Sequence, residues 1–385
     1  MNQLLKRYWY FIIILGLVSL FSDMVYETGR SLYGSFLKQL EASSFVVGFF
    51  AGLGEFLGYA LRYVFGRIAD RTGKYWWFVI LGYAINLVSV PLLAFVGMWQ
   101  WAVVLIVLER IGKALRAPSK DAILASVTVH VGHGKGFAIQ EVLDQLGATL
   151  GPALMIFALG AQANYVRGFM LLFIPAVLAL LFLLLAYFYF PKVGQIQSST
   201  KSFTIKELPR SLWMYMAAIA LVAIGFADFP LIGFHIKSHD IMMDKWIPAL
   251  YALIMLVDGV AAFVEGWAFD KWGIKVLFFV SFLNPILPWF IFSLRPEWII
   301  VGAVLYGISL GAQESIFKSY LASVASDNRA TLFGTFHLVY GLSWFLGSAI
   351  ASYFYGISLV GMLIFLTLVQ VAAIPFFFLT LRSGK

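Results

Sequence analysis

The 385-residue sequence contains no cysteine and few charged residues. Without thiols the chain has no disulfide bonds, no cysteine nucleophile and no thiolate metal ligands. Charged residues make up 12% of the sequence and hydrophobic residues 62%. Soluble domains average roughly 25% charged and 45–50% apolar residues. The composition therefore excludes a soluble globular domain and indicates a protein that lives in the lipid bilayer.

Long apolar spans recur along the whole chain, whereas the alternating pattern of a transmembrane β-barrel is missing. A helix needs about twenty apolar residues to cross the hydrocarbon core. We therefore predict an all-α integral membrane protein with about twelve transmembrane helices. The predicted spans lie near residues 9–37, 43–65, 75–97, 100–123, 136–159, 167–190, 211–235, 246–269, 275–294, 298–321, 331–355 and 358–381.

The net charge of +8 could indicate binding to nucleic acid, but most lysines and arginines, Lys120 among them, fall on one side of these spans. By the positive-inside rule this asymmetry predicts a multi-pass protein of the cytoplasmic membrane with both termini in the cytoplasm. The first span carries acids and lacks a small-residue cleavage site, so we expect a retained helix and not a signal peptide.

A motif is repeated at about half the chain length. Residues 66–74 read Gly-Arg-Ile-Ala-Asp-Arg-Thr-Gly-Lys, and residues 266–273 read Gly-Trp-Ala-Phe-Asp-Lys-Trp-Gly. Such a repeat is typical of transporters built from two halves. The longest polar run lies between the copies. We predict a six-helix bundle over residues 1–190, a cytoplasmic linker over 191–210 and a second, pseudo-symmetric six-helix bundle over 211–385.

The first copy resembles the cytoplasmic signature of the major facilitator superfamily, G-x-x-x-D-R-x-G-R/K. The matching residues are Gly66, Asp70, Arg71, Gly73 and Lys74. The resemblance implies the major facilitator fold and a gating role, in which the Asp and Arg lock the two halves together on the cytoplasmic side. The glycine spacing indicates a tight turn and a close helix approach. Alternatively, these charges only enforce the topology.

Two further segments resemble efflux proteins of this superfamily. Residues 147–152, Gly-Ala-Thr-Leu-Gly-Pro, are similar to the Gly-Pro motif of drug-type antiporters, but lack its glycine pair after the proline and an upstream glycine. Residues 116–125, with Phe21, Asp23 and Glu27, resemble a prokaryotic branch of efflux permeases. This implies efflux and leaves the cargo open. We expect Gly151 and Pro152 to form a flexible point, because proline removes a backbone hydrogen bond and bends the helix.

Charged residues inside the first span share one helical face. Asp23, Glu27 and Arg30 are four and three residues apart. Charges at membrane depth are costly, so they usually face the bundle interior and mark a pathway. One interpretation is that Asp23 or Glu27 carries a coupling proton. The alternative is a structural pair, in which Arg30 neutralises Glu27.

The fourth span carries Glu109, Lys113 and Arg116 on one face, with Arg110 turned about a hundred degrees away. Glu141 and Asp144 of the fifth span are expected partners of these bases. The bases form either an anion-binding site, which suits a guanidinium fork, or a salt-bridge network between the two spans. The predicted proton-coupling residues are Asp23, Glu27 and Asp144. The predicted substrate contacts are Arg30, Glu109, Lys113, Arg116, Glu141 and Asp258, the last near the middle of its span.

Together these features predict a secondary transporter that works by alternating access. Proton-coupled efflux by antiport is the first expectation, and proton- or cation-coupled uptake of a small organic solute or anion is the alternative. A membrane-embedded enzyme is a remote alternative, because the sequence has no H-E-x-x-H motif or hydrolase pair. We expect no cofactor, no metal and no nucleic acid. The expected partners are the lipid bilayer, a small-molecule substrate and protons or another coupling cation, and we expect the chain to work as a monomer.

Overall fold

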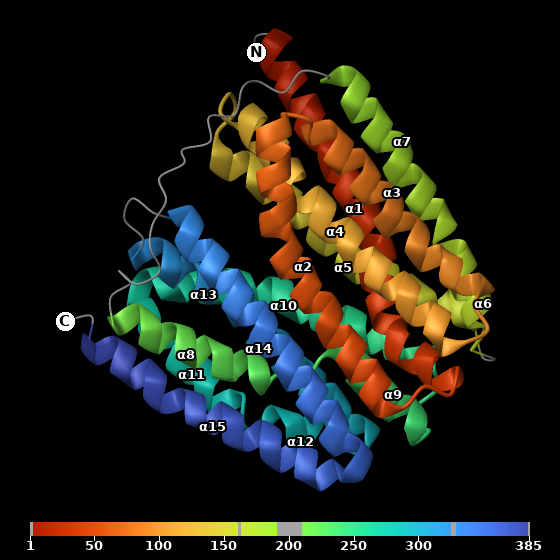
Figure 1. Ribbon diagram of the computed structural model, residues 1–385, viewed down its shortest axis with the longest axis vertical. Helices are drawn as coiled ribbons and strands as arrows, with labels where there is room; N and C mark the ends of the chain where they lie inside the picture. Colours follow the sequence, from red (N-terminus) through yellow and green to blue (C-terminus); the bar gives the residue numbers. More distant parts are fainter. Residues whose placement is uncertain (1–2, 161–162, 191–209, 325–328, 384–385) are drawn as a thin grey trace. The chain divides into compact units, whose positions relative to one another are not determined.

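A computed structural model describes residues 3–160, 163–190, 210–324 and 329–383 (Figure 1). Within these ranges every regular element is a helix. Nine helical stretches of the described residues are long and apolar enough to cross a membrane. The predicted all-α, multi-pass membrane architecture is thereby confirmed.

Each predicted span coincides with one helix or with a broken pair. The first half of the chain forms α1 (Gln3–Gln39), α2 (Ser44–Thr72), α3 (Tyr75–Leu92), the 3₁₀ turn η1 (Leu93–Phe95), α4 (Trp99–Thr128), α5 (His133–Leu159), α6 (Tyr165–Leu171) and α7 (Phe173–Tyr189). The second half forms α8 (Arg210–Ile224), α9 (Phe229–Ser238), α10 (Trp246–Trp272), the 3₁₀ turn η3 (Gly273–Lys275), α11 (Val276–Leu283), α12 (Leu287–Ile291), α13 (Pro296–Val324), α14 (Arg329–Ile357) and α15 (Leu359–Ser383).

The seventh predicted span is broken between α8 and α9. The buried Asp228 caps α9, and its carboxylate accepts a hydrogen bond from the backbone N–H of Phe229 at 2.9 Å. Pro230 occupies the first turn of α9, where its missing N–H costs no helical hydrogen bond. An acidic cap followed by proline is a helix-start signal, so this break has a local cause in the sequence.

The chain forms two compact units. The first comprises residues 1–32, 57–199 and 244–252, and the second comprises residues 33–56, 200–243 and 253–385. The predicted linker over 191–210 lies outside the described residues, apart from Arg210 at the start of α8. The division of the chain into two six-helix bundles at that linker stays a prediction.

Helices α3 and α4 are in backbone contact in the first unit. A Cβ atom added at Gly112 would lie 2.6 Å from the backbone nitrogen of Asn86, and one added at Gly82 would lie 2.7 Å from that of Arg116. Only glycine permits such a close approach. The contact places Tyr83 and Asn86 of α3 against the charged face of α4.

Helices α1 and α5 approach each other just as closely. A Cβ atom added at Gly151 would lie 2.7 Å from the Cα atom of Met24 and 2.6 Å from Oγ1 of Thr28. Pro152 follows within α5, which continues as a helix to Leu159. Gly151 therefore sets the distance between α5 and α1, and the flexibility expected at Gly151 and Pro152 stays a prediction.

Replacement of Gly151 by alanine is expected to lower the free energy of unfolding by about 1–3 kcal/mol, because the added methyl group meets the α1 backbone. Chemical unfolding of the purified protein in detergent measures this change. Gly58→Ala in α2 is the matched control, since nothing lies within 4 Å of its added Cβ. There alanine should stabilise the helix slightly. A Gly151→Ala protein as stable as the control would contradict the close packing.

Candidate functional site

Charged side chains of α1, α4 and α5 gather inside the first compact unit. We call them the charged cluster. Its members are Asp23 and Glu27 of α1, Glu109, Arg110, Lys113, Arg116 and Lys120 of α4, and Asp144 of α5. Helix α4 supplies most of them, and the glycine contacts with α3 described above bring its charged face against polar neighbours.

Asp23 and Arg116 form an ion pair between α1 and α4. Nη2 of Arg116 lies 4.0 Å from Oδ1 of Asp23, and the side chains are 5% and 18% exposed, respectively. The Arg116 guanidinium also lies over the ring of Tyr83, 4.3 Å from its centre. Arginine suits this position because its planar group both stacks on an aromatic ring and pairs with a carboxylate. The pairing connects two residues that the sequence assigned to separate roles.

Lys120 joins α4 to both α1 and α5. Its ammonium nitrogen lies 3.8 Å from Oδ2 of Asp144 and donates a hydrogen bond to Oγ of Ser19 at 2.5 Å. The charge asymmetry along the sequence predicts that Lys120 is one of the topology-determining charges, but its side chain is only 9% exposed. Its position four residues after Arg116 and seven after Lys113 places all three on one helical face, and this spacing could have identified it.

Two cationic side chains of α4 lie against the ring of Tyr26 on α1. The ammonium nitrogen of Lys113 lies 3.4 Å from the centre of the Tyr26 ring, and the Arg110 guanidinium lies 4.8 Å from it. Arg110 also donates a hydrogen bond to the Tyr26 hydroxyl. A buried aromatic face attracts cations electrostatically. Although their side chains leave α4 in different directions, Lys113 and Arg110 thus share one partner on α1.

Glu109 is fully buried and held by two neighbours. Its Oε1 accepts a hydrogen bond from Nδ2 of Asn86 at 2.7 Å, and its Oε2 lies 3.4 Å from Nε of Arg110. Asn86 also donates to the backbone oxygen of Glu109 at 3.2 Å. A carboxylate with this burial and these partners fits the salt-bridge interpretation better than contact with a substrate.

Glu27 accepts a hydrogen bond from the hydroxyl of Tyr251 at 2.6 Å. Tyr251 belongs to α10 and lies in the same compact unit as Glu27. Arg30, one turn further along α1, is half-buried. The sequence could not identify Tyr251, because 224 residues separate it from its partner.

Two further predicted site residues lie on α5 and α10. The side chain of Glu141 on α5 is exposed, and Asp258 is buried in α10 within the second compact unit. Asp258 lies near a close approach of α10 and α13, where a Cβ added at Gly311 would be 2.9 Å from the Asp258 carbonyl oxygen. In the described part of the chain, no group of three or more histidines and acids is arranged to hold a metal ion.

The motif at residues 66–74 forms the end of α2 and the turn into α3. Gly73 has φ of +67°, a left-handed conformation that glycine adopts without strain. A Cβ added at Gly66 would lie 3.3 Å from Pro118 of α4, and Asp70 accepts a hydrogen bond from the Tyr75 hydroxyl at 3.0 Å. The predicted tight turn and close helix approach are confirmed. Arg71 and Lys74 are exposed, and the gating role stays a prediction.

Comparison with known proteins identifies relatives over almost the whole chain. A protein of Mycobacterium tuberculosis described as uncharacterised is 33% identical over 378 residues, which cover 96% of this chain and 92% of the relative. A protein of Methanocaldococcus jannaschii described as an uncharacterised MFS-type transporter is 29% identical over 357 residues, covering 90% of this chain and 88% of the relative.

Solved structures of transporters share the fold. A mutant form of the nucleoside transporter NupG matches with a TM-score of 0.78 and 13% identity over 97% of this chain and 100% of that one. A bacterial homologue of the human lysosomal transporter Spinster matches with a TM-score of 0.75 and 15% identity over 100% of this chain and 98% of that one. The sequence-family model of the Major Facilitator Superfamily matches residues 12–348 of this chain. The chain therefore belongs to the major facilitator superfamily and is a multi-pass membrane transporter, not an enzyme.

Proposed function

We propose that this transporter is secondary active and moves a small solute by alternating access, by efflux in exchange for protons. The observation that carries the proposal is the pair of Asp23 and Arg116. Asp23 is 18% exposed, whereas Arg116 is 5% exposed. The carboxylate is therefore the more accessible member of the pair, while its counter-charge is held inside the protein. This combination suits a group that gains and loses a proton during a cycle.

The charge balance of the cluster supports exchange. The charged cluster contains the acids Asp23, Glu27, Glu109 and Asp144 and the bases Arg110, Lys113, Arg116 and Lys120. The formal charges of these eight residues cancel when all are ionised, so a proton bound to Asp23 adds one positive charge to the cluster. A cationic solute bound there adds the same positive charge. Because excess charge is costly in a poorly solvated site, the proton and the cation exclude each other, as antiport requires.

A second candidate is proton-coupled uptake of a small organic anion, and Lys113 favours it. Within the described residues Lys113 forms no ion pair, and its ammonium group lies against the Tyr26 ring. An anion attracted to Lys113 would offset the charge of a proton on Asp23. The anion and the proton would then bind together, which is symport. The sign of the solute charge therefore decides between the two mechanisms.

Other parts of the chain complete the proposal. Gly66, Asp70, Arg71, Gly73 and Lys74 would control opening on the cytoplasmic side, with Gly151 and Pro152 as a flexible point in α5. Glu141 and Asp258 are proposed contacts for a cationic solute, and Arg30, Lys113 and Arg116 are proposed contacts for an anionic one. The protein is proposed to work as a monomer in the cytoplasmic membrane with both termini in the cytoplasm. No nucleic acid or cofactor is part of this mechanism.

The experiment is a measurement of internal pH in proteoliposomes after external addition of ethidium, uridine or succinate, with the membrane potential clamped by potassium and valinomycin. Antiport predicts that entry of the cation ethidium raises internal pH, because protons leave in exchange. Symport predicts that entry of the anion succinate lowers it. Protein-free liposomes are the control. Saturable tracer uptake of any of these solutes without a change in internal pH would contradict proton coupling.

A further inference from the structure

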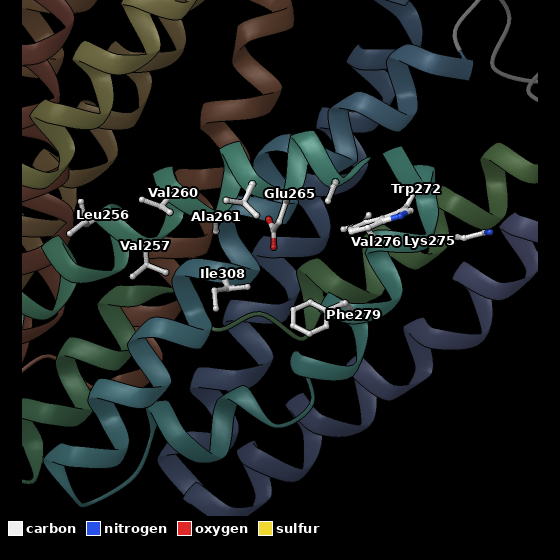
Figure 2. Close-up of a pocket in the computed structure, with 12 residues that line it drawn as sticks. Leu256, Val257, Val260, Ala261, Glu265, Trp272, Lys275, Val276, Phe279 and Ile308 are labelled. Carbon is white, nitrogen blue, oxygen red and sulfur yellow. The ribbon is translucent and has the colours of Figure 1, made fainter. Parts of the chain in front are cut away.

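We propose that a pocket in the second compact unit binds an amphiphilic organic cation, with the carboxylate of Glu265 as the counter-charge. The pocket lies beside α10, α11 and α13 and has a volume of about 840 Å³ (Figure 2). This volume is within the range of roughly 300–1,000 Å³ that is usual for small-molecule sites. Apart from Glu265 and Lys275, every lining side chain is apolar or aromatic.

Glu265 carries a buried carboxylate in the largely apolar surroundings of this pocket. The residue is only 7% exposed, and neither of its carboxylate oxygens has a hydrogen-bond partner among the described residues. An ionised carboxylate in apolar surroundings is costly unless a cation or hydrogen-bond donors compensate it. A bound cationic group would supply that compensation.

The neighbouring described bases are directed elsewhere. Lys275 is exposed at the pocket rim, and Figure 2 shows its amine pointing away from Glu265. The ammonium nitrogen of Lys271 lies over the rings of Trp267 and Trp272, 5.5 Å and 5.4 Å from their centres. In the same view the Glu265 carboxylate points toward the space that Ile308 and Phe279 border. The acid therefore faces the pocket.

The pocket walls indicate the rest of the ligand. Leu256, Val257, Val260, Val264 and Val276 supply apolar surface around the carboxylate. Phe279 and Trp272 add aromatic rings, which attract organic cations as well as apolar groups. An anionic amphiphile would be repelled by Glu265, and a small hydrated cation would leave the walls uncovered. The ligand that matches this pocket is therefore a molecule with bulky apolar groups around one positive charge.

An acid precedes only the second copy of the repeated motif. Glu265 directly precedes the second copy of the repeated motif, at residues 266–273, and Phe65 occupies the equivalent place before the first copy. The pocket shares no residue with the charged cluster.

The test compares binding of two ions of nearly the same shape and opposite charge to the purified full-length protein. Equilibrium dialysis with radiolabelled tetraphenylphosphonium, against detergent blanks, should show saturable binding, and tetraphenylborate should bind at least tenfold more weakly. Glu265→Gln should weaken tetraphenylphosphonium binding at least tenfold. Glu314→Gln is the matched control, because it removes an exposed acid of α13 in the same unit. This control should bind like the wild type.

A second variant tests the pocket without changing its charge. Val260 lines the pocket and is 61% exposed, so Val260→Trp should be tolerated and should obstruct the space. We expect weaker tetraphenylphosphonium binding and an unchanged size-exclusion profile. Equal binding of the two ions would indicate that the walls alone hold them and would overturn the role of Glu265. Wild-type binding in both Glu265→Gln and Val260→Trp would overturn the site.

Discussion

Replacing Asp23 by asparagine is expected to reduce solute-driven proton movement in proteoliposomes to the level of protein-free liposomes. Asparagine keeps the shape of the side chain but cannot bind and release a proton. It also mimics the protonated acid, so the charged cluster keeps a permanent positive charge. If the solute is a cation, its binding should weaken at least tenfold, and any ethidium flux that remains should no longer change internal pH.

The matched control for this variant is Asp121→Asn. Asp121 is an exposed acid of the same helix that carries Arg116, so its replacement removes one negative charge outside the cluster. This control should keep proton movement within about twofold of the wild type, because exposed charges have small effects. Size-exclusion chromatography verifies that both variants fold. An Asp23→Asn protein that still moves protons with its solute would show that another group carries the proton.

A second replacement separates binding from coupling. Lys113→Met added to Asp23→Asn restores the formal neutrality of the charged cluster without restoring a titratable acid. Binding of a cationic solute should recover, whereas proton movement should stay absent. Recovery of proton movement in the double variant would contradict Asp23 as the proton carrier. A site for anions predicts the opposite effect on binding, since Lys113 would be the group that attracts the solute.

The helices could be predicted because their cause is local. Apolar spans of sufficient length specify transmembrane helices, and each predicted span has a helical counterpart. The face shared by Asp23 and Glu27 also followed from local spacing, because residues four apart lie one turn apart. The break before Phe229 had a local signal in Asp228 and Pro230, but the hydropathy of the span concealed it.

The partners of the charges could not be predicted, because they depend on which helices pack together. Asn86 reaches Glu109 only because Gly82 and Gly112 let α3 and α4 touch. The sequence alone indicates that Lys120 is a cytoplasmic charge that sets the membrane topology. The packing of α1 and α5 places Ser19 and Asp144 beside it. The pocket at Glu265 likewise depends on α10, α11 and α13 together. Sequence spacing determines which residues share a face of one helix. It does not determine which residues of other helices they contact.

Replacing Glu109 by alanine is expected to lower the free energy of unfolding by about 3 kcal/mol, the lower end of the range for breaking a buried ion pair. The change removes the acid beside the buried Arg110 and the acceptor of the shorter Asn86 hydrogen bond. Chemical unfolding in detergent measures the loss. Glu314→Ala is the matched control, because it removes an exposed acid of α13 and should change stability by less than about 0.5 kcal/mol.

Removing both members of the pair should be less harmful than removing one. In Glu109→Leu with Arg110→Leu, no charge is left buried without its partner, and two apolar side chains fill similar space, so much of the stability should return. If Glu109 contacted a substrate and held no neighbouring helix, stability would stay unchanged in Glu109→Ala. The fully buried Glu109 lies between Asn86 and Arg110, so we expect the loss to appear in folding. If it does, Glu109 holds α3 against α4, and Asp23, Lys113 and Arg116 stay the proposed groups of the cluster that respond to solute and proton.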